Sequence, residues 1–303
     1  MKAAFLTALL AAFFVFVLAA AAGETRIPVI TTILPYKEFI EAVGGERVVV
    51  SVLIPPGANP HAFELTPEGL KKAAAAKLYV KAGSGIEFEL VWADKIISQR
   101  SGIAVCDSSR GIALLGEEEA EGEHGHHPGG KDPHVWLSPS NSRRIVENIR
   151  DCLIALAPEH ADEFRANAEK YGERLAALDR ELQALFSPRK DRALLVFHPS
   201  WGYFARDYGL EQIAIEAEGK EPSPRSLARL IETTRRKGIR TVFISPQTSD
   251  KTARAVAEAL NARVAIADPL AGDYLDNLRN FGRAAAEGDL PEPVPTCLPF
   301  YPP

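Results

Sequence analysis

Cysteine is scarce in this chain. Three cysteines occur among 303 residues, and no two have the CxxC spacing. The missing CxxC spacing argues against a thiolate zinc site and against a thioredoxin-like redox motif. Because three is an odd number, at least one thiol stays free or pairs between chains, and the sequence alone does not assign a disulfide among Cys106, Cys152 and Cys297.

The chain also lacks long basic blocks and a second long apolar run. Its formal net charge is -5, with 35 Lys and Arg against 40 Asp and Glu. Without a clustered basic surface, nucleic acid is not an expected partner. After the N-terminal leader, no further stretch is apolar and long enough to cross a membrane.

The leader itself predicts export. Lys2 precedes an apolar run that ends in Ala20, Ala21 and Ala22 before Gly23, which suits signal peptidase. We therefore expect a signal peptide at residues 1–22, cleaved to leave a periplasmic protein. The alternative is an uncleaved anchor, because the run is just long enough to span a bilayer. No cysteine stands at the cleavage point, which argues against a lipid-anchored lipoprotein.

The remaining chain reads as lobe, long helix, lobe. Short β-branched runs alternate with helical patterns, which predicts α/β lobes of parallel sheet flanked by helices. The first lobe is predicted at 23–157, with strands at 27–33, 47–54, 77–82 and 103–106 and helices at 35–43, 66–76 and 87–98. The second is predicted at 188–303, with strands at 193–197, 211–216, 241–245 and 263–267 and helices at 201–208, 224–237, 249–260 and 273–286.

Between the lobes, apolar residues step by four and three from Phe164 to Leu185. This spacing gives one apolar stripe and predicts a linker helix within 158–187. The alternative is a coiled-coil arm, although so short a stripe in an α/β chain favours packing against its own lobes.

Residues 107–133 interrupt the alternation. The stretch GEEEAEGEHGHHPGGK is charged, rich in glycine and without apolar period, so a mobile loop is expected here. Within 115–131, His124, His126 and His127 stand among glutamates. They form a candidate accessory loop for collecting metal ions, or a solvated segment without a role.

Three other histidines each stand beside a proline near the end of an element: His61 in NPHAF, His134 in DPHVW and His198 in FHPSW. Asp268 ends a strand in the same manner. Ligands of open parallel sheets collect beyond the carboxyl ends of the strands, so two facing lobes would bring these four side chains to one cleft. Three imidazoles and one carboxylate suit tetrahedral Zn²⁺. Each histidine taken alone could instead be structural; His160, in a helical pattern, is expected on a solvated face.

The motifs NPHAFELTP, DPHVWLSP, FHPSWGYFARDYGL, EGKEPSPRSL and IADPL occur in this order. Together they resemble the zinc-binding, ZnuA-like substrate-binding proteins of metal ABC importers (cluster A-I), over about residues 27–286. The resemblance implies two lobes joined by a rigid helix, with metal bound between them by His61, His134, His198 and Asp268. Manganese-carrying relatives typically have glutamate at the third position, so His198 favours zinc.

The expected function is therefore capture of Zn²⁺ outside the membrane and delivery to a cognate ABC permease and its ATPase, by a monomer without enzymatic activity. Three alternatives stay open: a secreted zinc-dependent hydrolase, a manganese-binding member of the same fold, and an adhesin. Trp136, Trp201 and Tyr203 lie near the ligand motifs and are expected either to line the cleft or to be ordinary core aromatics.

Overall fold

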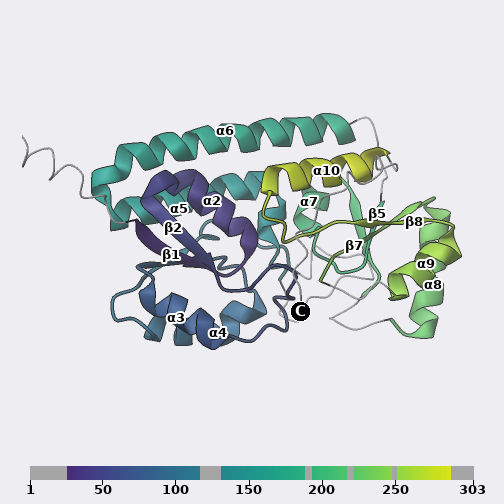
Figure 1. Ribbon diagram of the computed structural model, residues 1–303. Helices are drawn as coiled ribbons and strands as arrows, with labels where there is room; N and C mark the ends of the chain where they lie inside the picture. The colour runs from purple at the N-terminus through teal and green to yellow at the C-terminus, as the bar shows by residue number, and fades with distance from the viewer. Residues whose placement is uncertain (1–25, 117–130, 188–192, 217–221, 248–250, 288–303) are drawn as a thin grey trace, which may run out of the picture.

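Two four-stranded parallel sheets form the framework of the protein (Figure 1). The computed structural model describes residues 26–116, 131–187, 193–216, 222–247 and 251–287. The first sheet has the order β2-β1-β3-β4 and the second the order β6-β5-β7-β8. This confirms the predicted fold class of two parallel-sheet lobes flanked by helices and linked by a long helix.

The N-terminal lobe follows the predicted alternation closely. Each strand is only four or five residues long, and parallel neighbours need helical crossovers between them. Thr66 caps the helix that follows it, because its hydroxyl accepts a hydrogen bond from Gly69 N at 3.0 Å. The elements are β1 (Ile27–Thr31), α2 (Leu34–Gly44), β2 (Val48–Val52), α3 (Pro67–Ala75), β3 (Leu78–Lys81), α4 (Glu87–Ser98) and β4 (Ala104–Asp107).

The C-terminal lobe repeats this strand order. Ser223 caps α8 by accepting from Ser226 N at 3.2 Å, and Pro224 occupies the first turn, where its missing N–H costs nothing. The elements are β5 (Ala193–Val196), α7 (Gly202–Asp207), β6 (Glu211–Ala214), α8 (Pro224–Arg236), β7 (Thr241–Ile244), α9 (Lys251–Leu260), β8 (Arg263–Ile266) and α10 (Tyr274–Glu287).

Helix α6 (Ala161–Phe186) runs along both lobes (Figure 1). Its 26 residues span about 39 Å at 1.5 Å per residue. The predicted linker helix is confirmed, although residues 158–160 form a separate 3₁₀ turn before it. The apolar stripe contacts α2, α5 (Pro139–Leu156) and α10, so it is covered by the chain's own lobes. Its buried members are Phe164, Ala168, Tyr171, Leu175, Leu178, Leu182 and Phe186.

One hydrophobic core continues across both lobes. It extends from β1 through α5 and α6 to α7 and α10, and a second, smaller cluster fills the space between β5, β6, β7, α8 and α9. Polar ties reinforce the shared core: Glu181 of α6 accepts from Arg279 at 2.8 Å and from Arg283 at 3.0 Å. The C-terminal lobe is thus fixed to the long helix through α10.

The segments on either side of the acidic stretch are ordered. Asp107 completes β4 and Ser108 is fully buried. The side-chain amide of Asn148 donates to Ser108 O at 2.8 Å and to Arg110 O at 2.9 Å, which satisfies both carbonyls. Gly116 and Lys131 pair in an antiparallel bridge. The candidate collecting residues His124, His126 and His127 lie outside the described residues.

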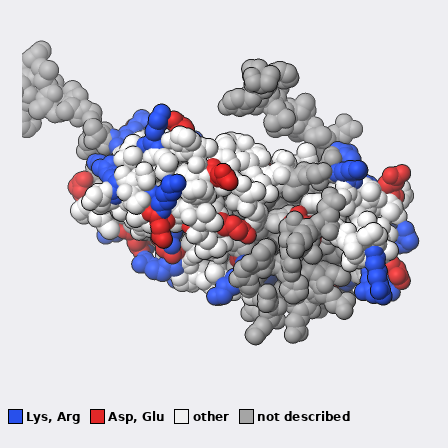
Figure 2. All heavy atoms as spheres, turned by 90° about the horizontal axis from the view of Figure 1, so that it is seen from below, with Lys and Arg blue, Asp and Glu red and all other residues white. Residues whose placement is uncertain are grey.

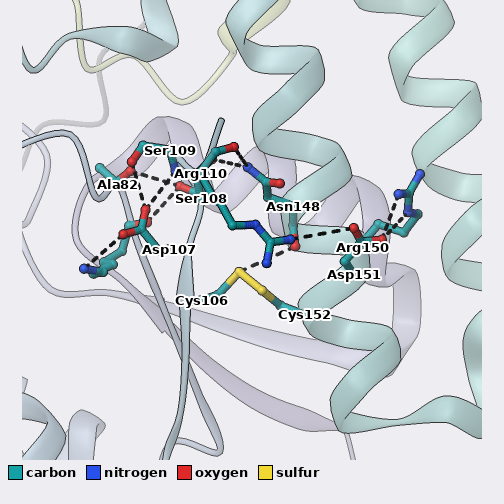
Figure 3. Close-up of a disulfide and its surroundings, with 11 residues drawn as sticks. Ala82, Cys106, Asp107, Ser108, Ser109, Arg110, Asn148, Arg150, Asp151 and Cys152 are labelled. Atoms are coloured by element: carbon teal, nitrogen blue, oxygen red, sulfur yellow. Dashed lines mark hydrogen bonds and ion pairs between the residues drawn. A yellow bond between two sulfur atoms is a disulfide. The ribbon is translucent and has the colours of Figure 1, made fainter. Parts of the chain in front are cut away.

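A disulfide joins Cys106 of β4 to Cys152 of α5, a pair the sequence left unassigned (Figure 3). The cysteines are 46 residues apart, with a Cα–Cα distance of 5.9 Å. Asn148 lies one turn earlier on α5 and holds the segment after Cys106, so disulfide and amide fix the same loop (Figure 3). In the part of the chain the structure describes, no helix has the length and apolar character to cross a membrane.

We predict that replacing both Cys106 and Cys152 by alanine lowers the free energy of unfolding by about 2–4 kcal/mol, because the unfolded chain regains the freedom of a long loop. Denaturant unfolding of the variant and of the parent measures this loss. As a control, unfolded but unreduced parent should react with a thiol reagent at one cysteine only. Reaction at all three would contradict the disulfide.

Candidate metal site

Three histidines from three separate loops meet between the lobes. His61 lies between β2 and α3, His134 directly precedes the 3₁₀ turn Val135–Leu137, and His198 follows β5. Their ring centroids are 4.8 Å apart for His61 and His198, 5.3 Å for His134 and His198, and 5.9 Å for His61 and His134. One nitrogen of each ring lies within 4.8 Å of the others. The predicted convergence of these three side chains is therefore seen in the structure.

Each imidazole is oriented by a carboxylate at its Nδ1 atom. His61 pairs with Glu87 at 2.7 Å and His198 with Glu216 at 3.1 Å. His134 pairs with Asp132 at 2.8 Å, and the same oxygen of Asp132 also accepts from His134 N at 2.9 Å. A carboxylate only accepts, so in each pair Nδ1 carries the proton and donates.

With the proton held on Nδ1, the lone pair of each ring lies on Nε2. This arrangement, a carboxylate behind each ligating imidazole, fixes the tautomer and raises the basicity of the ligand atom. Nitrogens bound to one zinc ion at about 2.0–2.1 Å in tetrahedral geometry would be about 3.3 Å apart. One ligand atom of each ring lies within 4.8 Å of the others, so the rings would have to move closer together to coordinate one ion.

The site is built to keep the buried His134 neutral. Burial disfavours the imidazolium and holds the pKa of His134 well below its usual range, and the neighbouring His198 and His61 lower it further. Burial alone would raise the pKa of Glu87, but the hydrogen bond and charge of His61 outweigh it and the net pKa is lowered. Neutral imidazoles backed by ionised carboxylates are the form that binds a divalent cation.

Asp268 does not belong to this group of converging ligand atoms among the described residues. It follows β8, as predicted, in a segment that we call the aspartate loop, residues 267–273. Its Oδ1 accepts from Gln247 Nε2 at 2.8 Å and from Leu270 N at 2.9 Å. The structure thus places Asp268 at the carboxyl edge of the second sheet, oriented through one oxygen and outside the histidine cluster.

The nearby aromatics are buried parts of the core. Trp201 stacks on Phe281 of α10 with centroids 3.5 Å apart. Tyr203 donates to Asp132 O at 2.8 Å and accepts from Leu115 N at 2.9 Å. Trp136 has its ring 5.3 Å from that of His134, so it both packs in the core and adjoins the site.

The sequence did not identify the three orienting carboxylates. Glu216 stands two residues after the end of β6, so the rule of strand ends that selected His198 could have found it. Asp132 precedes His134 by two residues, a spacing that lets an aspartate accept from the following backbone. Glu87 resembles an ordinary acid at the start of a helix, and only the fold brings it to His61.

Gly202 shows how closely the lobes approach at this site. A Cβ atom on Gly202, at the start of α7, would lie 2.5 Å from Oδ2 of Asp132. Real Cβ atoms do not come so near, and Asp132 is itself buried with little room to move. A glycine is therefore needed where the segment after His198 passes the carboxylate that orients His134.

A buried glutamate anchors the connection from β3 to α4. Glu89 accepts from Thr32 Oγ1 at 2.5 Å, Ala82 N at 2.7 Å and Gly83 N at 2.9 Å. In the same connection, Ser84 Oγ donates to Pro133 O at 2.5 Å, next to His134. This connection leads into the first turn of α4, where Glu87 holds His61. The connection from β3 to α4 therefore joins Glu87, which binds His61, to the segment that carries His134.

The fold and the site together define a two-lobed, metal-binding substrate-binding protein. Residues 29–288 match the family described as zinc-uptake complex component A, periplasmic, and the chain belongs to this family. The family is one of metal-binding transport components and is not a class of enzymes.

Known relatives agree with this assignment. The chain is 33% identical over 265 residues to the zinc-binding protein AdcA of Streptococcus pyogenes serotype M3. That alignment covers 82% of this chain and 52% of AdcA, so the chain spans about half the length of this curated relative. A crystal structure of ZnuA superposes with a TM-score of 0.81 at 36% identity, covering 87% of this chain and 99% of that one. A zinc-bound ZnuA with residues 138–173 of its own numbering deleted gives 0.80 at 36% identity, over 89% and 100%.

We predict that Glu89 makes the stability of the metal-free protein fall as pH rises. Burial raises the pKa of Glu89 above its ordinary value of 4.5, so the folded state binds a proton that the unfolded state has lost. The stabilising effect of this proton is complete below pH 4.5 and is lost as pH rises through the folded pKa. Unfolding free energies of the parent and Glu89→Gln, measured with a chelator from pH 4.5 to 8, report it.

The difference between the two proteins isolates Glu89 from the histidines, which titrate in both. The advantage of the parent over Glu89→Gln should shrink as pH rises. A pH-independent difference would contradict the prediction.

Proposed function

We propose that this protein captures Zn²⁺ outside the inner membrane and delivers it to the permease of an ABC importer. The observation that carries the proposal is the set of three imidazoles facing one another, each oriented through Nδ1 by its own carboxylate. A structural role would not need three such rings to converge from three loops. A metal-capture role needs this arrangement, because it exposes three preformed nitrogen donors.

In this proposal Asp268 is the fourth ligand. Its carboxylate would offset one of the two charges on the ion and complete a tetrahedron with His61, His134 and His198. Because Asp268 belongs to the second lobe and His61 to the first, the ion would be enclosed by both. Asp268 must move closer to the histidines for this. A shift of the aspartate loop would bring it there, since Asp268 lies at the sheet edge that faces the histidines.

The donor set favours zinc over manganese. Three imidazole nitrogens suit borderline-soft Zn²⁺, whereas Mn²⁺ prefers carboxylate and other oxygen ligands. The zinc-binding names and the zinc-bound structure among the relatives support the same choice. Zinc is thus the cargo of the protein and not a cofactor for chemistry.

Export and delivery complete the proposal. We infer that residues 1–22 are a signal peptide that is removed, that the mature chain works as a monomer in the periplasm, and that its partners are the permease and the ATPase of the importer. The acidic loop with His124, His126 and His127 would gather zinc near the cleft without forming the tight site. Nucleic acid is not among the proposed partners, and on the face shown in Figure 2 acidic and basic side chains are interspersed.

We predict one tight zinc site per chain in chelator-stripped protein. His61→Ala and His198→Ala should each weaken zinc binding by at least about a hundredfold, because even groups that only orient a ligand cost roughly tenfold to a hundredfold. Competitive titration with a coloured chelator of known affinity measures this, and excess Mn²⁺ should not displace the zinc. His160→Ala, on the outer end of α6, is the matched control and should bind like the parent. Displacement by manganese would favour a manganese carrier.

A second prediction separates the collecting loop from the site. Deletion of residues 117–130 should leave the tight affinity unchanged, since Gly116 and Lys131 already pair and a short link can join them. The same titration on the deletion variant tests this. If tight binding is lost with the loop, the cleft is not the principal zinc site.

A further inference from the structure

The aspartate loop is held largely by the other lobe. Tyr274 directly follows the loop, and its backbone N donates to Glu38 Oε2 of α2 at 2.7 Å. The other oxygen of Glu38 accepts from the hydroxyl of Tyr171 in α6 at 2.6 Å. Gly272 packs so closely on α2 that a Cβ there would lie 3.0 Å from Leu34 Cδ2. The loop that carries Asp268 is therefore positioned by α2 and α6 as well as by its own sheet.

Trp136 connects this loop directly to the segment of His134. Its indole N–H donates to Pro269 O at 2.7 Å, next to Asp268 in the chain. Its backbone carbonyl accepts from the hydroxyl of Tyr274 at 2.7 Å, at the other end of the loop. The hydroxyl of Ser142 donates to the carbonyl of Trp136 at 3.0 Å. It also lies 2.9 Å from the hydroxyl of Tyr274. Trp136 thus holds the aspartate loop near both of its ends.

These contacts are buried and therefore specific. Trp136 is only 2% exposed, and Tyr274 and Ser142 are also buried. A donor left unpaired in such surroundings costs the full loss of its hydration, so the indole and the Pro269 carbonyl keep each other in place. The ring also borders His134, with centroids 5.3 Å apart. The side chain of Trp136 therefore contacts both the imidazole of His134 in the first lobe and the loop that carries Asp268 in the second.

We propose that Trp136 is the positioning residue that sets Asp268 against the three-histidine cluster. The inference rests on the proposed function, in which Asp268 is a ligand. Trp136 does not touch the ion; it acts through Pro269. From its own lobe, Asn277 binds the carbonyl of Asp268 and Gln247 binds its Oδ1. Trp136 provides the contact from the opposite lobe. Trp136 couples two of the four ligands across the cleft.

The test is a double-mutant cycle on zinc affinity with chelator-stripped full chain. Trp136→Phe keeps an aromatic ring and removes the indole donor. We expect it to weaken zinc binding about tenfold, as for other groups that orient ligands. In the background of Asp268→Ala the same substitution should have almost no further effect, because no carboxylate remains to be positioned. A merely structural tryptophan would give the same loss in both backgrounds.

Two further variants keep the test decisive. Tyr274→Phe removes only the hydroxyl that binds Trp136 O, and it should show the same dependence on Asp268 even if Trp136→Phe folds poorly. Trp201→Phe is the matched control: an equally buried tryptophan that stacks on Phe281 within the second lobe. It should lower the melting temperature without an Asp268-dependent change in affinity.

Each failure has a separate meaning. Unchanged affinity in Trp136→Phe and Tyr274→Phe, or equal losses with and without Asp268, would overturn the positioning role and leave the proposed function standing. Unchanged affinity in Asp268→Ala would overturn the assignment of Asp268 as ligand, and with it the role of Trp136. Absence of a tight zinc site in the parent protein would overturn the proposed function itself.

Discussion

The structure depends on the shared core that fixes two parallel sheets with their carboxyl edges facing each other. Helix α6 packs on α2 and α5 of one lobe and on α10 of the other, so the lobes are parts of one packed body along this side. Close-packed interiors are stiff and transmit position over long distances. A site assembled from loops of both lobes can keep its geometry only on such a support.

At the cleft, hydrogen bonds between the three imidazoles and their carboxylates fix the orientation of the rings. Three pairs, each in a partly or fully buried position, set the tautomers of His61, His134 and His198 in advance of any ion. Such preorganisation lowers the ordering cost of binding, because the rings do not need to find their orientation when the metal arrives. The excess carboxylate charge around the rings also favours a divalent cation.

The segment from Asp132 to Ser138 is the meeting point of the two lobes. Although it leads into α5 of the first lobe, its side chains and carbonyls bind Tyr203, Pro269 and Tyr274 of the second. Ser138 caps α5 through its hydroxyl and also donates to Asp207 of α7. The sequence pattern suggested a division of the chain at residue 158. This boundary follows the order of the elements along the chain, but the packing does not separate there.

The sequence by itself determined the elements and the placing of histidines near their ends. Alternating β-branched and amphipathic segments are local signals, so the strands, the helix near 159–186 and the histidines at element ends could be predicted. Long-range contacts decide where this alternation is interrupted: Asn148 orders the segment after Asp107. Only the tertiary structure paired Cys106 with Cys152, brought Glu87 to His61 and set Trp136 on the aspartate loop. These contacts join residues from 26 to 133 positions apart, and no local pattern encodes which distant partner a buried polar group will meet.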